Sequence, residues 1–203
     1  NIRGRKCVVV GGGQVALRKV RVLLEHGADV EVISPDLCPE LAKLAQGREI
    51  HALTRKYQAG DLKNAFVAIV ATDSGDINQR VVVEARRRAV LVNVVDDAGN
   101  SDFIVPSYLR RGALTIAVST GGKSPALARK IRSRLEKELG DEYALVVCLI
   151  GEVRAEIRQQ KIKIDNDDWQ EALDLDQLLD LLRKGEKLKA KAILLSNLKA
   201  KQQ

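Results

Sequence analysis

Several residue types are scarce in this chain of 203 residues, and each shortage excludes a class of function. Aromatic residues make up only 3% of the sequence, too few for the stacking platforms that bind single-stranded nucleic acid. No run of about 18 apolar residues occurs, so we expect no membrane-spanning segment. Methionine is absent, there are two histidines, and no cluster of histidine and cysteine predicts a permanent metal site.

Cysteine is also rare: Cys7, Cys38 and Cys148 lie far apart in the sequence. An odd number of cysteines at wide spacing predicts neither a disulfide framework nor a zinc site. Free thiols are typical of a reducing compartment, and no signal peptide is visible. We therefore expect a cytoplasmic protein.

What the chain does contain is enough apolar sequence to fold. Hydrophobic residues make up 45% and charged residues 30%, a composition that supports a buried core. Lysine and arginine number 34 against 27 aspartates and glutamates, a net charge of +7. Such an excess favours an anionic partner, although a solvated basic surface gives the same count.

Short apolar runs alternate with amphipathic segments through the first half of the chain. Strands are expected at 6–10, 29–34, 49–54, 66–71 and 90–95, and helices at 16–26, 37–46 and 77–88. This alternation predicts an α/β fold with a Rossmann-like parallel sheet. The strands are apolar almost throughout, which indicates burial on both faces of the sheet.

The pattern changes after residue 97. A small hairpin is expected from strands at 103–108 and 114–119, followed by helices at 125–140 and 141–160 and a largely helical stretch at 169–199. Leu145, Leu149, Val153 and Ile157 form an apolar stripe that needs a partner surface. Either the α/β domain or a second copy of the chain would bury it. We expect three segments, 1–112, 113–140 and 141–203.

The most informative motif is Gly11-Gly12-Gly13-Gln14-Val15-Ala16, which fits the pattern G-x-G-x-x-G/A. It follows a predicted strand and opens a predicted helix, the context in which glycines admit a pyrophosphate to a helix N-terminus. Gly11 and Gly13 are the expected glycines of a nucleotide cofactor site.

The second strand ends at Ser34, where many dinucleotide-binding proteins carry an acidic residue that binds the ribose. Asp36, after Pro35, comes two residues later. It could reach the ribose or cap the next helix, and the sequence does not separate these roles. No arginine stands there to receive a 2′-phosphate, so NAD is favoured over NADP.

Two further groups of residues are candidates for chemistry. Asp96 and Asp97 follow the fifth predicted strand, where a carboxylate could transfer a proton or simply end the strand in a turn. A second glycine-containing loop precedes a predicted helix, and its hydroxyls, amides and ammonium group could hold carboxylates. The candidate substrate-binding residues in that loop are Ser119, Gly121, Lys123 and Ser124.

Five segments in fixed order resemble one family, precorrin-2 dehydrogenase, the N-terminal module of siroheme synthase. They are VVVGGGQVALRK (8–19), AIVATDSGDINQRV (68–81), NVVDD (93–97), DFIVPS (102–107) and AVSTGGKSPALARKIR (117–132). The resemblance is dense over 1–140 and loose over the helical tail.

The resemblance implies oxidation of precorrin-2 to sirohydrochlorin with NAD as cofactor. It places the important aspartate on Asp96 and the cofactor contacts on Gln14-Val15 and Pro35-Asp36. It also implies a homodimer, with segment 1–112 binding NAD, 113–140 serving dimerisation and substrate, and 141–203 forming a helical domain. The substrate carries many carboxylates, which suits the positive charge of the chain.

Two alternatives stay open at this point. Some members of the family also insert Fe(II) to make siroheme, so the chain could be a bifunctional dehydrogenase and ferrochelatase. A non-catalytic NAD-sensing module is the other alternative. A sensor has no need of the NVVDD, DFIVPS and STGGKSP segments, which favours an enzyme.

Overall fold

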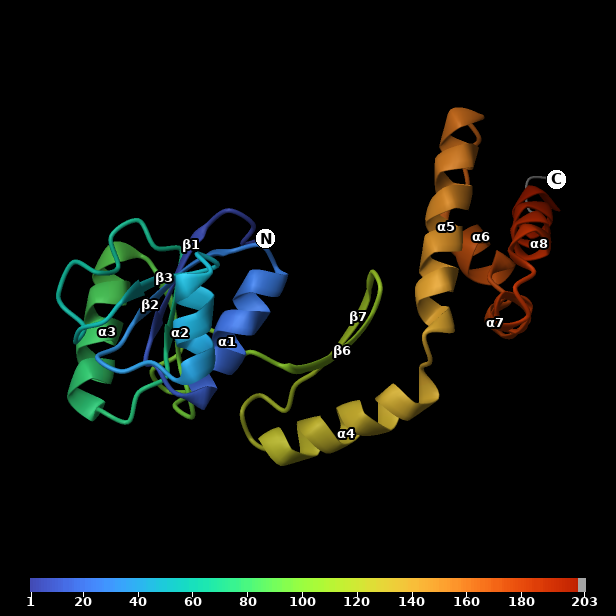
Figure 1. Ribbon diagram of the computed structural model, residues 1–203. Helices are drawn as coiled ribbons and strands as arrows, with labels where there is room; N and C mark the ends of the chain where they lie inside the picture. Colours follow the sequence, from blue (N-terminus) through green and yellow to red (C-terminus); the bar gives the residue numbers. More distant parts are fainter. Residues whose placement is uncertain (201–203) are drawn as a thin grey trace. The chain divides into compact units, whose positions relative to one another are not determined.

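The computed structural model describes residues 1–200 and divides the chain into two compact units, Asn1–Val105 and a second that begins at Pro106 (Figure 1). The hairpin belongs wholly to the second unit, whereas the boundary expected at 112 falls between its strands. The three functional segments expected from the sequence stay a prediction.

The first unit is a parallel sheet of five strands in the order β3-β2-β1-β4-β5. Together with its flanking helices this confirms the expected Rossmann-like α/β fold. The elements follow the predicted alternation: β1 (Lys6–Val10), α1 (Gln14–Glu25), β2 (Asp29–Ile33), α2 (Pro39–Gln46), β3 (His51–Leu53), β4 (Val67–Val70), α3 (Gly75–Arg88) and β5 (Leu91–Val94).

Both faces of the sheet are buried, as the apolar strands predict. Side chains alternate along β1, so Cys7 and Val9 join the cluster that packs with α1 and α2. Val8 and Val10 join the cluster on the opposite face, with α3. Strand β1 also lies between β2 and β4, where the strand order reverses. Ligands of open α/β sheets bind beyond the carboxyl ends of the strands at that point.

No helix connects β3 to β4; the link is an irregular segment, 54–66, that packs against α3. The half-buried Glu84 of α3 holds it in place. Its carboxylate accepts hydrogen bonds from the Tyr57 hydroxyl at 2.6 Å, the Gly60 amide at 2.9 Å and the Leu62 amide at 3.3 Å. Arg88, one turn later, donates to the same carboxylate at 2.7 Å.

The second unit begins with the antiparallel hairpin of β6 (Ser107–Arg111) and β7 (Leu114–Val118). The prediction that its first strand spans 103–108 was wrong. Phe103 belongs to the first unit, where its carbonyl accepts a hydrogen bond from the Asn93 side chain, and Pro106 has no amide to donate to a strand ladder. Helix α4 (Pro125–Glu138) follows and contacts both strands.

The remaining residues form α5 (Glu142–Gln159), α6 (Asn166–Ala172), α7 (Leu175–Arg183) and α8 (Lys187–Ala200). The stretch expected to be largely helical at 169–199 is thus covered by three helices, and Asp165 and Asp174 cap two of them. The buried face of α5 contacts α7 and α8, so the chain itself covers most of the predicted stripe. Leu145 is the exception, at 51% exposed.

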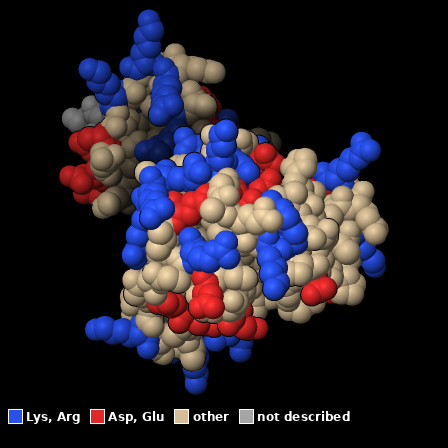
Figure 2. All heavy atoms as spheres, turned by 90° about the vertical axis from the view of Figure 1, so that its left-hand side faces the viewer, with Lys and Arg blue, Asp and Glu red and all other residues tan. Residues whose placement is uncertain are grey.

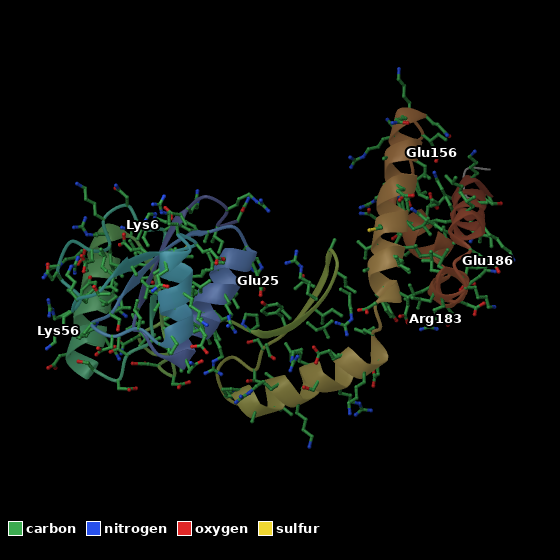
Figure 3. All side chains as sticks on the ribbon, viewed as in Figure 1. Lys6, Glu25, Lys56, Glu156, Arg183 and Glu186 are labelled. Carbon is green, nitrogen blue, oxygen red and sulfur yellow. The ribbon has the colours of Figure 1, made fainter. Side chains whose placement is uncertain are left out.

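Charged side chains stabilise the surface of this helical part. Arg183 of α7 pairs with Glu142, and Glu156 of α5 pairs with Lys191 of α8 at 2.8 Å. Figure 3 labels Arg183 and Glu156. None of the helices within residues 1–200 combines the length and the hydropathy that a transmembrane span needs. Basic and acidic side chains are interspersed on the face that Figure 2 turns to the viewer, so the positive net charge is not one continuous patch there.

Candidate functional site

The glycine loop leaves β1 at the reversal point of the sheet, and two of its glycines are required by close backbone contacts. Gly11 has a φ of +127°, and a Cβ there would lie 2.1 Å from the Ala71 carbonyl oxygen. A Cβ on Gly12 would lie 1.8 Å from the Asp36 carbonyl oxygen. The loops that follow β2 and β4 therefore lie directly against the glycine loop, and no side chain fits between them at Gly11 or Gly12.

Gly13 differs from its neighbours because a Cβ there would meet nothing within 4 Å. It is the N-cap of α1 with a φ of −88°, an ordinary value for any residue, and no side chain caps the helix. The first turn of α1 carries no acidic residue. An anion seated in the open space beside Gly13 would supply the negative charge that a helix N-terminus favours.

Gln14 and Val15 are the first two residues of α1, with Gln14 exposed and Val15 half-buried. These predicted cofactor contacts lie immediately after the open glycine. The glycine loop thus leaves open space at the N-terminus of α1, the place where dinucleotide-binding folds hold a pyrophosphate.

The loop after β2 is fixed to the glycine loop. The Cys38 amide donates to the Gly12 carbonyl at 2.8 Å, and Ser34 is only 8% exposed. Pro35 and Asp36 are exposed at the rim. Cys38, not Asp36, is the N-cap of α2, so the structure removes the capping role that the sequence left open for Asp36.

The sequence analysis missed Glu40, an acidic residue on the same rim. It lies in the first turn of α2, and its carboxylate accepts a hydrogen bond from the Gln14 side chain at 3.4 Å. Only the fold brings together these two residues, which no spacing rule connects.

The loop after β4 contains a second feature that the sequence analysis missed. The Thr72 hydroxyl donates to the Asn78 side-chain oxygen at 3.1 Å, and the Asn78 amide donates back to the Thr72 carbonyl at 3.2 Å. Thr72 also accepts from the Ser74 amide at 2.9 Å. This clasp holds the β4–α3 loop in shape next to Ala71, the residue that contacts the glycine loop.

Asp96 and Asp97 follow β5, but in a turn rather than in the strand, which ends at Val94. Asp97 is engaged: it accepts from the Asn100 amide at 3.1 Å and from the Asn100 side chain at 2.7 Å. These hydrogen bonds lower the pKa of Asp97 below its usual value. Asp97 therefore has a structural role in the turn.

Asp96 is exposed and adopts a φ of +60°, a left-handed conformation that aspartate and asparagine adopt more often than most residues other than glycine. Its charge acts on Lys19 of α1. Burial lowers the pKa of Lys19, and the Asp96 carboxylate opposes that effect. Asp97 instead lines a small hollow of about 110 Å³ with Asn78 and Gln79 of α3. The Asp96 carboxylate thus interacts with α1, whereas the Asp97 carboxylate lies beside α3.

The predicted substrate loop lies in the second unit, between β7 and α4. It is an ordered turn with Gly121 and Gly122 at positive φ. The Ser119 hydroxyl accepts from the Gly121 amide at 3.2 Å, and the Ser124 hydroxyl caps α4 by accepting from the Leu127 amide at 3.2 Å. Lys123 is exposed. The loop presents hydroxyl, amide and ammonium groups of the kind that bind carboxylates.

Comparisons with known proteins agree with this geometry. Residues 1–107 match a family model described as "Putative NAD(P)-binding", and residues 111–138 match one described as "Sirohaem biosynthesis protein central". The two matches fall on the sheet unit and on the hairpin with α4.

The chain is also similar to whole proteins. It is 38% identical to the siroheme synthase of Chromobacterium violaceum over 94% of this chain and 41% of that relative. It is 43% identical to the siroheme synthase of Methylobacillus flagellatus over 78% of this chain and 34% of that relative. The chain therefore spans about two fifths or less of these relatives. A solved structure of SirC, a precorrin-2 dehydrogenase, shares the fold, with a TM-score of 0.70 and 24% identity over 98% of this chain and 96% of that one.

Proposed function

Because this chain belongs to the NAD(P)-binding family found in siroheme synthases, we propose that it oxidises precorrin-2 to sirohydrochlorin with NAD as its cofactor. The observation that carries the proposal is the open side of Gly13. At the reversal point of the sheet, backbone atoms occupy the space that side chains on Gly11 and Gly12 would need. Gly13 instead faces open space at the N-terminus of a helix that no side chain caps. That arrangement suits a pyrophosphate, and an exposed carboxylate follows a strand of the same sheet.

The residues present fit the cofactor. Gly11, Gly13, Gln14 and Val15 would hold the pyrophosphate, and Pro35 and Asp36 would line the ribose side. NAD, when bound, accepts a hydride from the substrate. NAD is favoured over NADP because the rim after β2 carries carboxylates and no arginine where a 2′-phosphate would lie.

We assign to Asp96 the proton that leaves the substrate separately from the hydride. Precorrin-2 loses two electrons and two protons overall; a hydride takes both electrons and one proton, so one proton leaves separately. The Asp96 carboxylate is exposed and, among the described residues, no hydrogen bond from another residue occupies it. One of its oxygens would accept that proton or orient the carbon from which it departs.

The loop of Ser119, Gly121, Lys123 and Ser124 would bind substrate carboxylates. The chain would act as a homodimer, since Leu127 and Ile131 of α4 are 50% and 39% exposed and Leu145 adds a further apolar side chain. Sedimentation at micromolar concentration tests this part: a dimer is expected, and a monomer would contradict it.

The function itself is tested by anaerobic incubation with precorrin-2, with and without NAD, following sirohydrochlorin by its absorbance. Sirohydrochlorin should form only when NAD is present. Tight NAD binding without any sirohydrochlorin would contradict the proposal and support a non-catalytic NAD sensor.

A further inference from the structure

A second carboxylate stands beside the glycine loop. Glu40 accepts the Gln14 side-chain hydrogen bond at 3.4 Å, and Gln14 directly follows the open Gly13. The position is fixed by backbone contacts, because the Cys38 amide binds the Gly12 carbonyl at 2.8 Å and α2 begins at the next residue. Glu40 is therefore held at the rim where the adenosine end of a dinucleotide would lie.

Glu40 carries its charge there. A hydrogen bond from its own backbone amide, at the start of α2, lowers the pKa of its carboxyl, and the nearby charge of Arg21 acts in the same direction.

The position where an acidic residue usually selects NAD is taken by Ser34, which is buried against Gly12. Selection against a 2′-phosphate must then come from beyond the strand. Asp36 is exposed at the rim, but among the described residues no side-chain hydrogen bond fixes its carboxylate. Glu40, in contrast, is joined to the glycine loop through Gln14.

We propose that Glu40 is the residue that makes this site reject 2′-phosphorylated dinucleotides. The inference rests on the proposed function, which places a dinucleotide at the glycine loop. Glu40 acts through its charge, which repels a 2′-phosphate. The adenosine ribose of NAD carries no such phosphate, so NAD binding is little affected.

Titration calorimetry of the full chain with NAD and with NADP tests this proposal. Glu40→Gln should bind NADP about five- to tenfold more tightly than the unaltered chain, the size expected for one exposed charge, and should change NAD affinity less than about twofold. The matched control is Glu49→Gln, which removes the same charge from an exposed position beyond α2 and should leave the ratio of the two affinities unchanged.

Ionic strength gives a second readout that needs no variant. Raising the salt concentration from about 0.01 M to 1 M should reduce the disadvantage of NADP relative to NAD, because screening weakens the repulsion. A disadvantage that does not depend on salt would contradict electrostatic rejection.

The outcomes separate this inference from the function on which it rests. If Glu40→Gln leaves the ratio unchanged, or Asp36→Asn moves it further than Glu40→Gln does, Glu40 is not the selecting residue although the chain still binds NAD. A chain that binds neither dinucleotide would contradict the proposed function itself.

Discussion

At the scale of single residues, the three glycines of one loop have different roles. Backbone carbonyl groups leave no room for a side chain at Gly11 or Gly12, whereas Gly13 borders only open space. Gly13→Val should therefore fold normally and lose NAD binding, because its side chain would occupy the place of the pyrophosphate. Calorimetric titration with NAD measures this.

The matched control for that variant is Gly151→Val, in α5, where a Cβ also meets nothing within 4 Å. It adds the same bulk far along the sequence from the glycine loop and should leave NAD affinity unchanged. Undiminished NAD affinity in a folded Gly13→Val protein would remove the cofactor from this loop.

The two adjacent aspartates differ in a similar way. Asp96→Asn keeps a residue that tolerates a positive φ but removes the proton acceptor, so turnover should fall by roughly 10²–10⁴-fold, the usual range for general acid–base groups, with little change in NAD affinity. Asp97→Asn should cost far less turnover, since Asp97 mainly holds its turn. Anaerobic initial rates of both variants decide between them. A greater loss for Asp97→Asn would show that Asp96 is not the carboxylate that accepts the proton.

The glycine motif could be recognised from the sequence because its spacing is local to a strand and the helix that follows, whereas Asp96 is singled out from Asp97 only by the family resemblance and stays a prediction. Glu40, Thr72 and Asn78 could not be recognised, since their roles arise from contacts between loops that only the folded sheet brings together. Asp96 and Asp97 follow the strand, as expected, but they lie in the turn after it, so strand alternation does not separate their roles.

At the scale of elements, Glu84 fastens the irregular β3–β4 link to α3. Burial alone would raise the pKa of Glu84, but hydrogen bonds from Tyr57, Gly60 and Arg88 outweigh it and lower the pKa. A carboxyl group with a lowered pKa stabilises the folded state fully above its unfolded pKa of about 4.3 and loses that contribution as the pH falls through the folded value.

Glu84→Gln should therefore lower the free energy of unfolding by about 1–3 kcal/mol at pH 7, the usual effect of disrupting hydrogen bonds to a charged group. The difference from the unaltered chain should shrink as the pH falls below about 4. Urea unfolding at pH 7 and at acidic pH measures both values. A difference that is the same at each pH would show that the carboxylate charge has no part in holding the link.

Most elements were predictable from periodicity because apolar strands and amphipathic helices alternate with clear turn residues. The hairpin start was not, since 103–105 is apolar like a strand yet is held by the first unit through Asn93. The division of the tail into α6, α7 and α8 depends on two capping aspartates that the apolar pattern alone does not reveal.

At the scale of the whole molecule, the chain comprises two units with separate cores. Leu149 is fully buried in the helical core, so Leu149→Ala should destabilise the second unit by about 2–5 kcal/mol. Saturating NAD should stabilise the first unit, by about 2.7 kcal/mol at 100 times its dissociation constant. Hydrogen exchange followed by mass spectrometry resolves the two effects, and protection by NAD confined to the helices of the second unit would contradict the assignment.

The central claim is the proposal that the chain transfers a hydride from precorrin-2 to NAD at the glycine loop. The most direct measurement is the ratio of NADH to sirohydrochlorin formed anaerobically by the unaltered chain, with Gly13→Val measured beside it. We predict one NADH for each sirohydrochlorin, and neither product from Gly13→Val. Sirohydrochlorin formed without NADH, or formed equally well by Gly13→Val, would contradict the account.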